Sequence, residues 1–121
     1  MVLPENVFST ATVIPYKWGA DCLGWNFIQQ PGAAVKQERM PPGTSEILHY
    51  HEFAQQFFFI LAGTAVFEVD GIETIVGKQQ GFSVLPGAKH KITNPVKEEL
   101  EFILFSFPSA DGDRIECGEP L

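Results

Sequence analysis

Apolar residues in this sequence recur with a period of two, in short runs separated by Gly and Pro. No stretch has the sustained three- and four-residue apolar spacing of an amphipathic helix. Many short strands separated by turn residues are typical of antiparallel sheets arranged as a sandwich or a barrel. The pattern therefore predicts an all-β chain. Strands are expected at 22–29, 35–40, 47–51, 57–61, 64–69, 72–76, 82–85, 91–93 and 100–107.

Turn signals separate these runs. The Pro-Pro-Gly sequence at 41–43 forces the chain to turn, the Asp-Gly pair at 70–71 predicts a tight hairpin, and a Pro-Gly pair follows at 86–87. The run 57–61 is continuously apolar, which predicts a strand that is buried on both faces. The chain after Pro108 is expected to be less regular.

Composition and charge limit the function. A chain of 121 residues, 45% of them hydrophobic, suits one compact domain over 1–121. A net charge of -7 argues against nucleic acid or an acidic membrane as partner. No segment approaches the length of a membrane span, and the N-terminus has no signal-peptide pattern, so we expect a cytoplasmic protein. Cys22 and Cys117 form no metal-binding or redox motif, and are expected to be free thiols.

The three histidines of the chain fall in two places. His49 and His51 lie two residues apart on an expected strand, so their side chains share a face with that of Ile47. His90 follows the turn at 86–87, where a strand can present it to the same cavity. A single histidine on an apolar face is usually a hydrogen-bonded core residue, whereas three that meet would bind one divalent ion of Zn, Cu, Ni, Fe or Mn.

These residues resemble the two sequence motifs of the cupin family. In the first motif, at 43–63, a glycine precedes His-x-His by five residues, and a glutamate and a second glycine follow. Gly43, His49, His51 and Gly63 fit this spacing, with Gln56 at the glutamate position. In the second motif, at 79–94, Gly87, His90 and Asn94 fit, while Gln79 and Leu85 replace a glycine and a proline. Several spaced positions agree at once, which is far more specific than a lone His-x-His.

The resemblance implies a small jelly-roll barrel, the double-stranded β-helix, formed as a single-domain cupin. It also implies one divalent metal ion inside the barrel, held by His49, His51, Gln56 and His90. Gln55 is an alternative ligand, although the spacing to Gly63 favours Gln56. Asn94 is expected to support its turn through backbone hydrogen bonds.

Gln56 departs from the family pattern in a way that bears on chemistry. Its amide oxygen is neutral and a weaker donor than a carboxylate, so the ion would keep its full charge and act as a stronger Lewis acid. Alternation from Gln56 directs Phe58 and Ile60 toward the cavity, where with Ile47 they are expected to line a substrate pocket. The same alternation turns Phe57 and Phe59 outward, where they would form an apolar patch suited to a homodimer.

Three classes of function stay open. A metal-dependent enzyme acting on a small organic molecule is favoured, in particular an oxygenase (a dioxygenase) that cleaves or oxidises a diketone, a phenol or a similar anion. An isomerase or decarboxylase would use the same Lewis acid without oxygen. The alternatives are a non-catalytic module that binds a small ligand and a barrel whose metal is purely structural. The sequence identifies no general acid or base.

Overall fold

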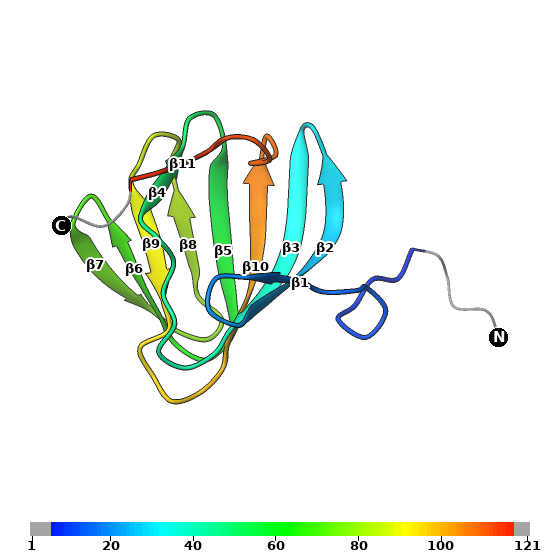
Figure 1. The fold of residues 1–121 in the computed structure, drawn as a ribbon, viewed down its shortest axis with the longest axis horizontal. Helices are drawn as coiled ribbons and strands as arrows, with labels where there is room; N and C mark the ends of the chain where they lie inside the picture. Colours follow the sequence, from blue (N-terminus) through cyan, green and yellow to red (C-terminus); the bar gives the residue numbers. More distant parts are fainter. Residues whose placement is uncertain (1–5, 118–121) are drawn as a thin grey trace.

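The computed structural model describes residues 6–117, which form eleven strands and no helix. The strands make two antiparallel sheets that fold into one barrel (Figure 1). In the six-stranded sheet the order is β1 (Tyr16–Trp18), β2 (Cys22–Gln30), β3 (Ala33–Met40), β10 (Leu100–Phe107), β5 (Gln55–Ala62) and β8 (Gly81–Val84). In the five-stranded sheet it is β11 (Arg114–Glu116), β4 (His49–His51), β9 (His90–Thr93), β6 (Ala65–Val69) and β7 (Ile72–Val76).

Strands far apart in the chain lie side by side in both sheets. β10 lies between β3 and β5, and β9 lies between β4 and β6 (Figure 1). These crossovers define the double-stranded β-helix, so the all-β prediction and the jelly-roll prediction are both confirmed. No helix within the described part of the chain is long and apolar enough to cross a membrane.

The core lies between the two sheets. Phe58 of β5 packs against Phe67 of β6 and Phe102 of β10, with ring centroids 4.9 Å and 5.6 Å apart. Along β5 buried and half-buried residues alternate, so the prediction that this strand is buried on both faces is wrong. Phe57 and Phe59 lie on the outer face and are half-buried. The inward and outward positions of β5 alternate, but the sequence does not show this because phenylalanine occupies both. Outer positions next to neighbouring strands can also be apolar.

Two elements were not expected from the sequence. β1 pairs with β2, and β11 pairs with β4, although the chain after Pro108 was expected to be less regular. The carboxylate of Asp113, next to β11, accepts hydrogen bonds from the backbone N–H groups of Glu52, Phe53 and Ala54 at 2.9–3.0 Å. The tail is therefore attached to the loop between β4 and β5. The Asp-Gly hairpin at 70–71 is confirmed, with positive φ at both residues.

Gly63, which closes the first motif, has a backbone that only glycine adopts without strain. Its φ is +85°, and a Cβ atom would lie 2.6 Å from the backbone oxygen of Glu99. We expect Gly63→Ala to lower the free energy of unfolding by about 2–5 kcal/mol, the sum of the left-handed strain and the overpacking. Denaturant unfolding checks this, with Gly32→Ala as the control because no atom lies within 4 Å of its added Cβ. Equal losses in the two variants would contradict the explanation.

Candidate metal centre

The three histidines meet on the inner face of the five-stranded sheet. His49 and His90 are directly paired in the register of β4 and β9, and His51 follows two residues later on the same face. The ring centroid of His49 lies 4.3 Å from that of His90 and 5.1 Å from that of His51. All three side chains are buried, and one nitrogen of each lies within 4.8 Å of the others. The convergence predicted from the sequence is therefore present.

The hydrogen bonds of two rings, each made through Nδ1, leave the lone pair of Nε2 available to an ion. Nδ1 of His49 lies 2.8 Å from the carbonyl oxygen of Ile47, and Nδ1 of His90 lies 2.8 Å from that of Ala88. Since a carbonyl oxygen only accepts, each Nδ1 carries the proton and donates it, and each Nε2 keeps its lone pair. Nε2 of His90 is buried without any partner. Such orientation of a ring by its other nitrogen is usual for metal-binding histidines.

The protein environment also keeps the imidazoles neutral. Desolvation lowers the pKa of His49 to about 3 and that of His51 to about 4, and it lowers the pKa of His90 as well. Only the neutral ring offers a lone pair to an ion, so the three rings are ready to bind one near neutral pH.

Gln56 of β5 lines the same cavity from the opposite sheet, as His49 and His51 do from theirs. Its Nε2 donates to the hydroxyl of Ser106 at 3.1 Å, while its Oε1 is buried and has no partner. A buried acceptor without a partner is costly unless something else satisfies it. The unpaired Oε1 of Gln56 and the unpaired Nε2 of His90 thus fit a divalent ion, to which the neighbouring rings of His49 and His51 can each offer a nitrogen.

Restoring the carboxylate at position 56 should strengthen metal binding. We expect Gln56→Glu to raise metal affinity about 10- to 100-fold, because an anionic oxygen replaces a neutral one. Competition with a chelator of known affinity measures this change. Gln55→Glu is the matched control, since Gln55 donates to Ser83 on the outer face of β5. Unchanged or weaker metal binding by Gln56→Glu would contradict the role of Gln56.

A cavity of about 270 Å³ opens beside these residues. Of the three residues expected to line a substrate pocket, Phe58 lies in its wall. Ile47 is placed outside it, 46% exposed, because β4 begins only at His49 and strand alternation does not reach back to Ile47. Ile60 lies in the apolar core with no exposed surface. The lining residues are Tyr16, Trp18, Lys36, Glu38, Glu46, His49, His51, Gln56, Phe58, Leu104, Ala110, Asp111, Gly112 and Arg114.

Two carboxylates in this wall, the buried Glu38 and the partly buried Glu46, were not expected from the sequence. Glu38 accepts a hydrogen bond of 2.6 Å from the phenol of Tyr16, and desolvation raises its pKa. Desolvation, followed by the charge of Glu38, raises the pKa of Glu46 to about 7. Glu46 accepts from the backbone N–H of Ile92 at 3.1 Å. The signal for Glu38 was available, because it shares the inward face of β3 with Met40.

Asn94 supports the fold, as expected. Its side-chain amide donates to the carbonyl oxygens of Met40 and Glu98 at 3.0 Å and 2.7 Å, and its oxygen accepts from the N–H of Val96. It is fully buried and holds the loop before β10. Cys22 and Cys117 are both free thiols, as expected.

The chain belongs to the cupin family, since the sequence profile described as "Cupin domain" matches residues 36–106. Tetracenomycin polyketide synthase protein TcmJ of Streptomyces glaucescens is 31% identical over 55 residues, covering 46% of this chain and 37% of that protein. The oxalate-binding protein of Thermotoga maritima is 32% identical over 65 residues, covering 54% of each. The matched regions therefore span about half or less of these relatives.

Solved structures agree with the fold. The polyketide cyclase RemF of Streptomyces resistomycificus superposes with a TM-score of 0.81 over 94% of this chain and 86% of that chain, at 12% identity. At this identity the likeness concerns the fold alone.

Proposed function

We propose that this cupin is a metal-dependent enzyme that moves a proton on a small organic molecule with an acidic C–H bond next to a carbonyl group. The observation that carries the proposal is the position of Glu38. Its buried carboxylate, held by Tyr16, lines the same cavity as His49, His51 and Gln56. A base and a candidate metal centre that face one cavity are the two parts that enolisation requires.

Each residue has a distinct part in this chemistry. A divalent ion held by the three histidines and Gln56 would supply a Lewis acid for a carbonyl oxygen. Glu38 takes the proton from the neighbouring carbon, and its raised pKa makes it a stronger base than an ordinary carboxylate. Desolvation and the charge of Glu38 raise the pKa of Tyr16, so the phenol keeps its proton and holds the carboxylate in place. Phe58 and Leu104 give the cavity an apolar side.

The size of the cavity and the relatives support this class of substrate. A volume of about 270 Å³ is at the small end of ligand sites, so a compact molecule fits better than a large polycyclic one. One sequence relative is described as a polyketide synthase protein and another as an oxalate-binding protein. Both descriptions involve oxygen-rich carbonyl compounds, and neither names an oxidation.

An oxygenase acting on the same compounds is the second candidate. The observation that favours it is the donor set, because three imidazoles and one amide are all neutral and leave the charge of an ion uncompensated. The isomerase alternative falls under the proton-transfer proposal, whereas a decarboxylase would use the same Lewis acid but break a C–C bond and release CO₂. A module that only binds a small ligand would not require a base in the cavity wall.

One experiment separates these candidates. The protein is stripped of metal, reloaded with Zn, Mn, Ni or Fe, and incubated in D₂O with pyruvate, acetoacetate and related ketones. We expect the loaded protein to accelerate exchange of the acidic C–H protons over the stripped protein, as followed by NMR, without oxygen uptake. Oxygen uptake that depends on the ketone would instead support the oxygenase. If no loaded form produces either signal, the proposal of an enzyme is contradicted, and a binding module remains.

A further inference from the structure

Arg114 brings a positive charge to the cavity that holds the histidines. It lies on β11, which is directly paired with β4, so that Arg114 is opposite His51 and Glu116 is opposite His49. Side chains of directly paired residues project from the same face of a sheet. Ile115, opposite Tyr50, therefore points away, and it is 40% exposed.

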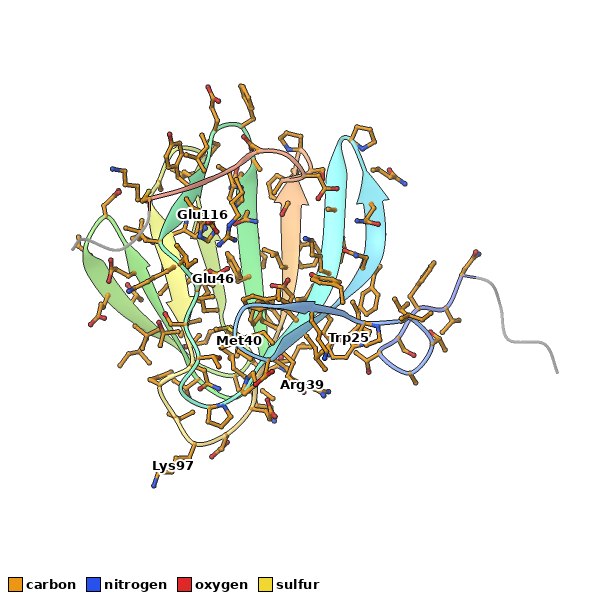
Figure 2. All side chains as sticks on the ribbon, viewed as in Figure 1. Trp25, Arg39, Met40, Glu46, Lys97 and Glu116 are labelled. Atoms are coloured by element: carbon orange, nitrogen blue, oxygen red, sulfur yellow. The ribbon has the colours of Figure 1, made fainter. Side chains whose placement is uncertain are left out.

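The contacts of this guanidinium are all long. Its Nη1 lies 3.4 Å from Nε2 of His49 and 3.7 Å from a carboxylate oxygen of Glu46, and its Nε lies 3.3 Å from Glu116. Both acidic partners are labelled in Figure 2. A well-made charged hydrogen bond is 2.7–2.9 Å long, so these partners do not saturate the five N–H donors of Arg114. The guanidinium is therefore positioned by these partners and still has N–H groups that can donate to a ligand.

The weak partner His49 matters most. Its Nε2 is the nitrogen that an ion would occupy, because its Nδ1 is committed to the carbonyl oxygen of Ile47. Once an ion binds there, Arg114 loses that acceptor and its charge faces a second cation. Two neighbouring positive charges favour an anion between them.

We infer that Arg114 recognises a carboxylate on the substrate, so that the compounds handled at this site are small organic acids that carry a second carbonyl or carboxyl group. This inference rests on the proposed function and adds the substrate class. A guanidinium is planar and matches a carboxylate with two parallel hydrogen bonds, whereas the ammonium of Lys36, elsewhere in the wall, is a point charge.

The acidic groups of the cavity lower its positive potential, but they leave donors of Arg114 unoccupied. Glu38 is engaged by Tyr16, Glu46 by the backbone of β9, and Glu116 is half-exposed at the rim. Asp111 lies in the wall as a further negative charge. The cavity therefore presents a partly exposed guanidinium whose acidic neighbours position it without enclosing it.

Binding of matched acids and amides tests the inference independently of turnover. Calorimetry on the zinc-loaded protein compares pyruvate, acetoacetate and malonate with pyruvamide, acetoacetamide and malonamide. We expect at least one acid to bind more tightly than its amide. Arg114→Gln should weaken binding of that acid about 10- to 100-fold, the value of a charged hydrogen bond, and leave the amide unchanged. Arg114→Lys should recover only part of the loss.

The control is Arg39→Gln. Arg39 forms an ion pair with Glu101 at 2.9 Å, lies outside the cavity wall and is labelled in Figure 2. Zinc content and circular dichroism establish that each variant is folded and loaded. If none of the acids binds more tightly than its amide, or if Arg114→Gln binds the preferred acid as the parent does, the inference is overturned. Preferred binding of an acid without C–H exchange would refute the proposed proton transfer and leave the role of Arg114 intact.

Discussion

Replacing Glu38 with glutamine is expected to lower the rate of C–H exchange about 100- to 10,000-fold, the usual contribution of a positioned general base. The substitution preserves the size of the side chain and an oxygen that accepts the Tyr16 hydrogen bond. It removes the negatively charged carboxylate that takes the proton. Because the amide is also easier to bury than a carboxylate with a raised pKa, the variant should be at least as stable as the parent. NMR exchange rates and thermal unfolding measure the two effects.

Two controls make this prediction specific to the base. Tyr16→Phe removes the O–H that holds Glu38 but leaves the carboxylate, and it should therefore cost less activity than Glu38→Gln. Metal content should be unchanged in both variants, since neither residue is among the proposed ligands. Exchange at the parent rate in a fully loaded Glu38→Gln protein would show that another group takes the proton.

Replacing His90 with alanine is expected to weaken metal binding by more than about 100-fold, because the loss of groups that merely support a ligand already costs 10- to 100-fold. His90 is fully buried at the pairing of β4 and β9, and its Nε2 has no protein partner. An ion would thus lose a ligand that no nearby side chain replaces. His49→Ala should have a similar effect. Elemental analysis after dialysis against a weak chelator measures the change.

Folding has to be separated from binding in this test. His90→Gln keeps most of the side-chain volume and serves as a second variant if the alanine leaves a destabilising cavity. Tyr50→Phe is the control, because Tyr50 lies between His49 and His51 on the opposite face of β4. If His90→Ala and His49→Ala retain as much metal as Tyr50→Phe, the proposed ligand set is wrong.

The all-β class and the shared face of His49 and His51 could be predicted because each depends on short-range order, whereas the jelly-roll barrel and the meeting of all three histidines were implied by the resemblance to the cupin motifs. The period of two places His49 and His51 on one face, and the Pro-Gly turn sets His90 at the start of the next strand. The hairpin at 70–71 follows from its two turn residues in the same way. These features require no knowledge of what lies across the barrel.

The charged part of the cavity could not be predicted in this way. Arg114 lies in β11, a three-residue strand that contains one apolar residue. This segment is a strand because it pairs with the edge of β4, and such pairing cannot be read from its own sequence. A single charged residue on a strand is ordinarily solvated, so Glu38 gave only a weak signal before the opposite wall was known. A homodimer formed through Phe57 and Phe59 and a cytoplasmic location stay predictions from the sequence.

The attachment of the tail by Asp113 connects the two binding sites proposed above. The backbone that its carboxylate holds, at 52–54, lies between the proposed ligands His51 and Gln56, and the next residue of the tail is Arg114. An organic acid at Arg114 would place its negative charge beside the ion, so the acid and the ion would each favour binding of the other. By thermodynamic reciprocity the two effects are equal in size. In a cell that is short of metal, the supply of the organic acid would then decide how much of this protein holds an ion.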